Sequence, residues 1–275
     1  MEQLAGKVAV ITGGASGIGF ATAKALAAKG VNLVLADIEA GALEKAAAEL
    51  TATGTKVESV VCDVSKLTDV ERLAATAFLR MGAVHVVFNN AGVAVGGPIT
   101  AMKHSDWEWI MRVNLWGPIH GVETFLPRMI NQKQGGHLLF TSSFAGLVPN
   151  EGLGPYCVSK YGVVALAEVL QRELREHDIG VSVLCPMRVA TNIGHSERNR
   201  PVDLGGPEAA PPMQDQDESN TNLAGRVLNV DDVAQMVIDA IVANRLYILP
   251  HEESRKSIRR RFERIDRTFD EQGRR

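Results

Sequence analysis

Cysteine, aromatic side chains, net charge and long hydrophobic runs are all scarce in this chain of 275 residues. The three cysteines, Cys62, Cys157 and Cys185, have no C-x-x-C spacing, which argues against a disulfide framework and favours small buried thiols in a reducing compartment. A redox role for Cys157 is the alternative to simple packing. Histidine and cysteine never cluster with metal-ligand spacing, so we expect no metal.

The charge balance and the hydropathy pattern exclude further classes of protein. A net charge of -3 gives no overall electrostatic footprint for nucleic acid. Apolar runs stay well short of the roughly eighteen residues of a membrane span, and the first expected strand starts too early for a signal peptide. We therefore expect a cytoplasmic protein with no nucleic-acid or membrane partner. With 45% hydrophobic residues, the chain can bury a large core.

Strand-like and helix-like segments alternate along the chain, which predicts an α/β fold with a doubly wound parallel sheet of the Rossmann type. The expected strands lie near 7–12, 31–36, 56–61, 84–89, 136–141, 180–185 and 246–249. The longest helices are expected near 104–131 and 155–177. We predict one catalytic domain over residues 1–250 and a C-terminal helix and tail over 251–275.

A glycine-rich turn follows the first expected strand. Residues 13–19, G-G-A-S-G-I-G, connect this strand to a helix-like segment at 20–29. Glycines let the backbone approach a diphosphate, and a helix N-terminus presents unpaired N–H groups to it. The second expected strand ends at Asp37, where a carboxylate can accept hydrogen bonds from an adenosine ribose. The alternative is a tight turn beside an ordinary surface aspartate.

Tyr156 and Lys160 lie four residues apart, so one helical turn brings them to the same face. A phenol loses its proton near pH 10, and a neighbouring ammonium favours the phenolate. At an effective dielectric of about 20, charges about 4 Å apart interact by about 4 kcal/mol, enough for a shift of about three pKa units. The pair is thus a candidate proton-transfer centre, with an exposed helical pair as the alternative.

Five motifs together resemble the short-chain dehydrogenase/reductase family. They are T-G-G-A-S-G-I-G at 12–19, N-N-A-G at 89–92, Asn114, S-S at 142–143 and Y-C-V-S-K at 156–160. The resemblance is close over residues 5 to 190 and looser to 250. It implies that Ser143 holds the substrate oxygen and that Tyr156 transfers its proton. It also implies that Lys160 contacts the nicotinamide ribose and lowers the pKa of the tyrosine, and that Asn114 holds a water linking Lys160 to solvent.

The same resemblance implies a set of cofactor-binding residues. The set is Gly13, Ser16, Gly17, Ile18, Gly19, Asp37, Asp63, Val64, Asn90, Ala91, Gly92, Tyr156, Lys160, Pro186, Val189 and Thr191. Because Ala15 and Ile38, rather than arginine or lysine, stand near Asp37, a 2'-phosphate would meet an uncompensated carboxylate. We therefore predict NAD as the cofactor.

Residues 192–222 combine four prolines with an acidic stretch and show no sustained periodicity, which predicts a long loop. The family resemblance implies a substrate lid here, which we place at 192–225, and a featureless loop is the alternative. We expect this segment to be poorly ordered without ligand.

Two positions depart from the family pattern. Met187 follows Pro186 where a glycine is usual, so it shapes the substrate pocket or fills space. His85 stands where an acid is frequent, and we interpret it as a structural histidine. The pocket positions projected from the family are all apolar, which indicates a hydrophobic or aromatic-bearing alcohol. They are Val93, Val95, Phe144, Leu147, Leu153 and Met187.

The tail has an amphipathic pattern, with Ile258, Phe262, Ile265 and Phe269 spaced by four, three and four residues among arginines. A membrane surface is one possible contact for this stripe, and we favour packing on its own domain or on a partner subunit. The segment L-Y-I-L-P-H before it resembles bacterial family members that oxidise benzylic alcohols of aryl ethers. In the resembling family the two long helices pair across a twofold axis, so we expect a homodimer or homotetramer.

Three classes of function fit these observations. We favour an NAD-dependent oxidoreductase that interconverts a secondary alcohol and a ketone. A lyase, epimerase or dehydratase on the same scaffold is the second class. A cofactor-sensing protein without turnover is the third, and the complete proton-transfer set of Asn114, Ser143, Tyr156 and Lys160 argues against it.

Overall fold

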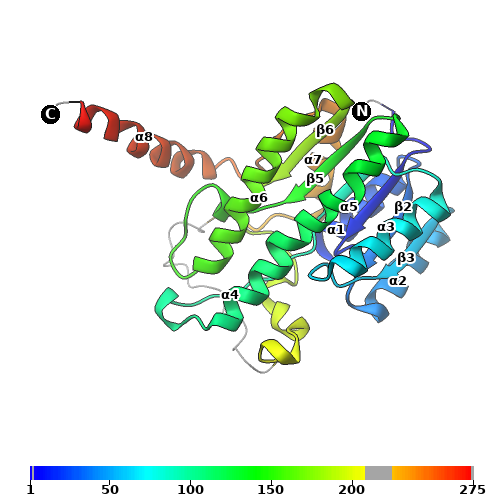
Figure 1. Cartoon of the computed structure of the whole chain (residues 1–275), viewed down its shortest axis with the longest axis horizontal. Coiled ribbons are helices and arrows are strands. Elements are labelled where there is room, and N and C mark those ends of the chain that lie inside the picture. The colour runs from blue at the N-terminus through cyan, green and yellow to red at the C-terminus, as the bar shows by residue number, and fades with distance from the viewer. Residues whose placement is uncertain (2, 208–224, 274–275) are drawn as a thin grey trace.

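Seven parallel strands form one sheet at the centre of the protein (Figure 1). The computed structural model describes residues 1, 3–207 and 225–273. The strands are β1 (Val8–Thr12), β2 (Asn32–Asp37), β3 (Val57–Val61), β4 (Val86–Asn89), β5 (Gly136–Thr141), β6 (Ile179–Leu184) and β7 (Tyr247–Ile248). Their order in the sheet is β3-β2-β1-β4-β5-β6-β7. The predicted doubly wound Rossmann fold is therefore confirmed.

Helices cover both faces of this sheet. The α-helices are α1 (Gly17–Ala27), α2 (Ala40–Ala52), α3 (Leu67–Met81), α4 (His104–Met111), α5 (Gly117–Gln132), α6 (Gly154–Glu173), α7 (Val230–Ala243) and α8 (Ser254–Gln272). The shorter helices are η1 (Ile99–Ala101), η2 (Arg112–Trp116), η3 (Phe144–Gly146), η4 (Leu174–His177), η5 (Ile193–Asn199) and η6 (Val202–Leu204).

Alternation along each strand builds the two halves of the core. Val8 and Val10 of β1 join the cluster that packs against α3, α5 and α6. Ala9 and Ile11, which point to the opposite face, join the cluster that packs against α1, α2 and α7. Both faces of the sheet are thus buried, as parallel sheets require.

The sheet places a crevice at the carboxyl ends of the strands. The chain winds outward from β1 to β3, then crosses back to β4 on the other side of β1. Loops after β1 and β4 therefore diverge and leave an opening between them, where open α/β sheets bind ligands.

The long helix expected near 104–131 is interrupted. Between α4 and α5 the chain makes a π-helical segment, η2, which contains Asn114. Single π turns of this kind interrupt α-helices mainly at functional sites, and a hydrophobic pattern alone does not reveal them. The second long helix, expected at 155–177, is α6 followed by the 3-10 turn η4.

The segment predicted to be an irregular lid is partly regular. Residues 192–207 contain η5 and η6, so the prediction of a loop without regular structure is wrong for this half. The other half, 208–224, lies outside the described residues. Short 3-10 turns carry no long apolar periodicity, which explains why the pattern missed them.

The predicted amphipathic tail helix is present as α8, and it projects away from the body of the protein (Figure 1). Its apolar stripe stays exposed: Phe262 is 56% and Phe269 73% exposed. Packing of this stripe on its own domain is therefore not what the structure shows. None of the helices in the described ranges combines the length and the apolar character needed to cross a membrane.

Candidate active site

A cavity of about 1040 Å³ opens at the carboxyl ends of β1 to β6, with Asp37 toward one end and Tyr156 toward the other. Its size suits a dinucleotide together with a small substrate. Most of the predicted site residues line it, because each follows the end of a strand or begins the next helix. They are Gly13, Ser16, Gly17, Ile18, Asp37, Asp63, Val64, Asn90, Ala91, Gly92, Ser143, Tyr156, Lys160, Pro186, Val189 and Thr191.

Two predicted residues do not line the cavity. Gly19 lies one turn into α1, where a Cβ atom would stand 2.2 Å from the carbonyl oxygen of Gly13. Its role is to let the helix approach the glycine turn. Asn114 is fully buried, and its amide pairs with both backbone groups of Val93 at 2.8 Å. Asn114 therefore fixes the chain that forms the cavity wall.

The glycine turn forms a cradle that fits a diphosphate. Gly13 and Gly17 have φ angles of +62° and +54°, which side chains other than glycine rarely tolerate. The N-cap residue of α1, Ser16, makes no side-chain cap, and no acidic residue stands in the first turn. The N–H groups at this helix end are thus oriented to bind an anion in the cavity.

Asp37 ends β2 beside this turn. Its carboxylate accepts the N–H groups of Ala15 at 3.0 Å and Glu39 at 3.1 Å. These two bonds fix the carboxylate in the cavity wall, where it can accept a ribose hydroxyl.

An arginine that the sequence did not single out pairs with Glu39, two residues after Asp37. Arg198 of η5 lines the same cavity and donates to Oε1 of Glu39 through Nε at 3.1 Å and Nη2 at 2.5 Å. Asn199 donates to the same oxygen at 2.9 Å. These bonds lower the pKa of Glu39, chiefly through Arg198. The charge of Arg198 is therefore already neutralised by a carboxylate.

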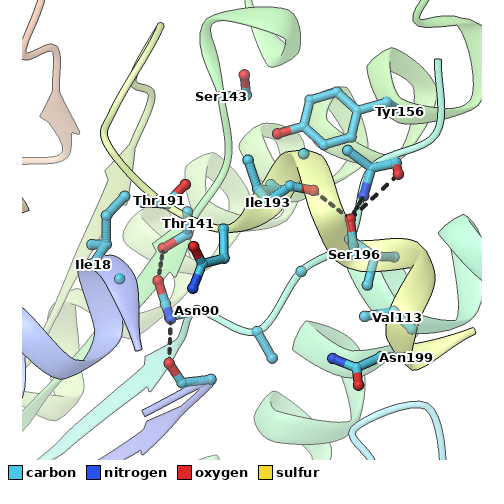
Figure 2. Close-up of a pocket in the computed structure, with 18 of the residues that line it drawn as sticks. Ile18, Asn90, Val113, Thr141, Ser143, Tyr156, Thr191, Ile193, Ser196 and Asn199 are labelled. Atoms are coloured by element: carbon cyan, nitrogen blue, oxygen red, sulfur yellow. Dashed lines mark hydrogen bonds between the residues drawn. The ribbon is translucent and has the colours of Figure 1, made fainter. Parts of the chain in front are cut away.

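Asn90 joins three strand ends behind the cavity (Figure 2). Its Nδ2 donates to the carbonyls of Thr12 at 3.0 Å and Gly13 at 3.2 Å, while its Oδ1 accepts the hydroxyl of Thr141 at 2.9 Å. The side chain that was predicted to bind cofactor thus holds the glycine turn in place.

Lys160 is buried beneath the cavity. It is 2% exposed, and its Nζ donates to the carbonyl of Thr141 at 2.9 Å and lies 5.5 Å from the Tyr156 ring centroid. A Cβ placed at Gly92 would lie 3.4 Å from this Nζ and 3.3 Å from Oδ1 of Asn114. Lys160 and Asn114 therefore converge on the same glycine.

Ser143 and Tyr156 present their hydroxyl groups to the same part of the cavity (Figure 2). Ser143 is the N-cap of η3: its Oγ accepts the N–H of Ala145 at 3.1 Å and donates to the carbonyl of Pro186 at 3.4 Å. Tyr156 stands in the first turn of α6. Two hydroxyl groups so placed can bind one substrate oxygen.

Burial governs the electrostatics of the pair. Burial raises the pKa of Tyr156 to about 12, and the Ser143 hydroxyl acts in the opposite direction. Burial also lowers the pKa of Lys160 to about 8. Burial is thus the largest influence on both groups in the protein alone, and the role of Lys160 in lowering the pKa of Tyr156 stays a prediction.

The segment 193–204 forms the outer wall of the cavity. Ser196 accepts the N–H of Ala94 at 2.9 Å and donates to the carbonyl of Ile193 (Figure 2). Arg200 is 3% exposed, donates to Asp106 at 2.6 Å and to the carbonyl of Leu204 at 2.7 Å, and stacks over Trp109. These contacts attach the segment to α4.

The apolar residues that line the cavity agree only in part with the family projection. Val93, Leu153 and Met187 line the cavity as expected, whereas Val95, Phe144 and Leu147 do not. Phe144 is only 1% exposed, because its ring joins the core. The remaining apolar wall is made by residues that the sequence did not single out: Trp109, Val113, Ile193, Leu204 and Val227.

No group of three or more histidine, cysteine, aspartate or glutamate side chains within residues 1, 3–207 and 225–273 could hold a metal ion. Cys157 is buried and its thiol contacts the backbone of Asn150, and burial raises its pKa. His85 is buried at the opposite end of the sheet, where its Nδ1 accepts the N–H of Val8 at 3.2 Å. Both observations agree with structural roles.

Comparison with known proteins identifies the family of this site. The model of the short chain dehydrogenase family matches residues 7–201. A C alpha-dehydrogenase of Sphingobium is 35% identical over 269 residues, covering 96% of this chain and 87% of the relative. A 1-deoxy-11-beta-hydroxypentalenate dehydrogenase of Streptomyces exfoliatus is 35% identical, covering 94% of this chain and 88% of the relative. A short-chain dehydrogenase of Burkholderia phymatum, solved in complex with NAD, superposes with a TM-score of 0.90 at 40% identity, covering 98% and 97% of the two chains.

Proposed function

The chain belongs to the short-chain dehydrogenase family, and from this premise we propose that it interconverts a secondary alcohol and a ketone with Ser143, Tyr156, Lys160 and Asn114. The observation that carries this proposal is the convergence of the Ser143 and Tyr156 hydroxyls on one part of the cavity, with Lys160 buried beneath them. Bound NAD would supply the acceptor for the hydride that leaves the alcohol carbon.

Each protein group has a distinct task in this reaction. Ser143 donates a hydrogen bond to the substrate oxygen and so fixes its position. Tyr156 takes the hydroxyl proton when the alcohol is oxidised and returns it when the ketone is reduced. Lys160, held by the carbonyl of Thr141, provides positive charge that stabilises the phenolate. Asn114 fixes the Val93 wall next to Lys160 and remains the candidate to hold a water there.

We propose NAD rather than NADP as the cofactor. The fixed carboxylate of Asp37 suits a free ribose 2'-hydroxyl and would repel a 2'-phosphate. Arg198 would offer a compensating charge, but Glu39 already pairs with it. The preference for NAD therefore depends on two carboxylates.

The substrate that fits this cavity is a hydrophobic or aromatic-bearing secondary alcohol. Trp109, Val93 and Leu153 line the cavity, and Leu153 packs with Tyr156. A relative named C alpha-dehydrogenase supports dehydrogenation at an alpha carbon. Segment 192–207 would cover such a substrate as part of the lid.

Net NADH formation with a panel of secondary alcohols tests the proposal. Aryl-substituted alcohols should yield NADH and ketone in equal amounts, with little turnover of sugars. Product formation without net NADH would indicate a lyase, epimerase or dehydratase instead. Cofactor binding without any turnover across the panel would support a sensing protein.

A further inference from the structure

His251 is a buried histidine that lies close to the site. None of the catalytic roles predicted from the sequence uses it. It follows β7 and Pro250, and only 1% of its surface is exposed. Its Nδ1 lies 3.2 Å from the backbone nitrogen of Met187. Its Nε2 lies 3.1 Å from the carbonyl of Arg188 and 3.2 Å from that of Arg226.

These partners determine the tautomer of the ring. The backbone N–H of Met187 can only donate, so Nδ1 must be unprotonated to accept it. The two carbonyl oxygens can only accept, so the single proton of the neutral ring sits on Nε2. Every polar atom of this buried ring is thereby satisfied.

The Nδ1 bond acts on the peptide unit that contacts Ser143. In the Pro186–Met187 peptide, the N–H donates to His251. The carbonyl oxygen of Pro186 accepts the Phe144 N–H at 2.8 Å and the Ser143 hydroxyl at 3.4 Å. Rotation of this peptide plane would therefore move both the hydroxyl of Ser143 and the side chain of Met187, which lines the cavity.

The Nε2 bonds hold the two ends of the segment between β6 and α7. Arg188 and Arg226 stand at the two ends of the segment that leaves the sheet after β6 and returns before α7. The same ends are joined by a bond from the Leu228 N–H to the carbonyl of Arg188 at 3.0 Å. Glu253, two residues after His251, accepts the N–H of Arg226 at 3.1 Å.

We propose that His251 is a positioning residue with two separate effects: through Nδ1 it orients Ser143, and through Nε2 it holds together the described ends, at Arg188 and Arg226, of the segment that carries η5 and η6. This inference rests on the proposed function of Ser143. Neither contact touches substrate, so His251 should affect the reaction only through these two partners.

Two substitutions separate the two contacts. In His251→Asn the amide oxygen can replace Nδ1, but the reach to the lid carbonyls is lost. In His251→Gln the longer amide can replace Nε2–H, but the acceptor for Met187 is lost. One lost hydrogen bond is worth about 1.4 kcal/mol, or about tenfold. We expect His251→Gln to lower kcat about tenfold with little change in KM, and His251→Asn to raise KM for the alcohol about tenfold with little change in kcat.

His85→Gln is the matched control, because its Nδ1 also accepts a backbone N–H in a buried place, at the far end of the sheet. It should lower stability without changing either kinetic constant. The proposal is overturned if the two His251 variants change kcat and KM alike, or if His85→Gln reproduces their kinetic changes.

Two further measurements do not depend on turnover. Hydrogen exchange should increase at residues 188–191 and 226–228 in His251→Asn, and much less in His251→Gln; equal protection in wild type and both variants contradicts the proposal. In the wild-type protein, nitrogen NMR should show coupling between His251 Nδ1 and the Met187 amide, and a protonated Nδ1 contradicts it without any variant. If the exchange and NMR results hold but no alcohol is oxidised, the proposed function fails and the lid contact of His251 stands.

Discussion

Tyr156 and Lys160 illustrate how far individual residues can be assigned from sequence. Their spacing, together with Ser143, identified the groups that converge in the cavity, because local motifs place residues at strand ends and helix starts. The electrostatics were not predictable in this way: burial raises the pKa of Tyr156 and lowers that of Lys160. Desolvation depends on all the atoms around a group, and these come from distant parts of the chain.

Removal of the phenol hydroxyl tests the proton-transfer role. Tyr156→Phe should lower turnover by about two to four orders of magnitude, the usual contribution of a general acid or base. Affinity for NAD should change little, because the ring and its packing remain. Steady-state kinetics and cofactor titration measure the two effects, and near-normal turnover in this variant would refute the assignment. Lys160→Ala should lower both turnover and cofactor affinity.

The buried ammonium of Lys160 should make stability depend on pH. Its pKa is about 8 in the folded protein and about 10.5 when exposed, so the unfolded state binds more protons between these values. The free energy of unfolding contributed by this residue should therefore rise from pH 8 to pH 10.5. Urea unfolding should show the free energy of unfolding of wild type rising relative to that of Lys160→Met across this range. A constant difference would mean that the lysine does not change charge on folding.

Cofactor preference can be tested at Asp37 and Glu39. Asp37→Ala with Ile38→Arg should shift the ratio of kcat/KM values toward NADP, because the repulsive carboxylate is replaced by a cation. Adding Glu39→Gln should shift it further, since Arg198 loses its carboxylate partner. Glu39→Gln alone serves as the control, because it removes the ion pair between Glu39 at the start of α2 and Arg198 of η5 while Asp37 stays in place. Equal efficiency of wild type with NAD and NADP would contradict the proposal.

At the scale of elements, alternating hydrophobicity was sufficient to locate the strands and most helices. It did not reveal the π-helical segment η2 or the 3-10 helices η5 and η6. Those elements depend on long-range side-chain bonds, from Asn114 to Val93 and from Arg200 to Asp106. Arg198 and Arg200 were the sequence signal for these anchoring bonds, in a segment that otherwise shows no periodicity.

The Arg200 network should hold the outer wall against α4. Arg200→Met leaves the buried carboxylates of Asp106 and Glu197 without their cation, and burial already raises the pKa of Glu197. We expect the free energy of unfolding to fall by about 3 kcal/mol, the usual loss when one partner of a buried pair is removed.

Arg80→Met is the control for this change. It breaks the exposed pair with Glu58 and should cost less than about 1 kcal/mol. Denaturant titration of both variants provides the comparison. An equal loss of the free energy of unfolding in the two variants would show that the buried network stabilises the fold no more than an exposed ion pair does.

At the scale of the whole molecule, α8 is the helix whose apolar residues are least covered by the rest of the chain. The helix projects from the body with Phe262 and Phe269 exposed, and its Arg261 contacts the ring of Tyr161 in α6 (Figure 1). His251 and Ser254, by contrast, are buried against the body, so we propose that the catalytic domain extends a few residues past the predicted boundary at 250. The exposed part of its apolar stripe favours contact with a second subunit.

Truncation tests this role of the tail. We propose at least a homodimer, with the stripe of α8 contributing to assembly or to its stability. A chain ending at residue 255 keeps His251 and Ser254 but lacks the stripe, and it should show a smaller or less stable assembly by light scattering. The double variant Phe262→Ser and Phe269→Ser should behave in the same way. An unchanged and equally stable assembly in both would exclude the tail from association.

The close pairing of Val189 with Leu228 has a consequence for how such enzymes diversify. Val189 and Leu228 stand at the two ends of the segment between β6 and α7, so this segment leaves the sheet and returns to it at one place. The free energy of closing a loop grows only slowly with its length, so an insertion after Gly205 should cost the fold little as long as the contacts of Arg198 and Arg200 are kept. Changes of length in this segment can therefore alter the part of the chain that meets substrate while the proton-transfer groups stay where they are.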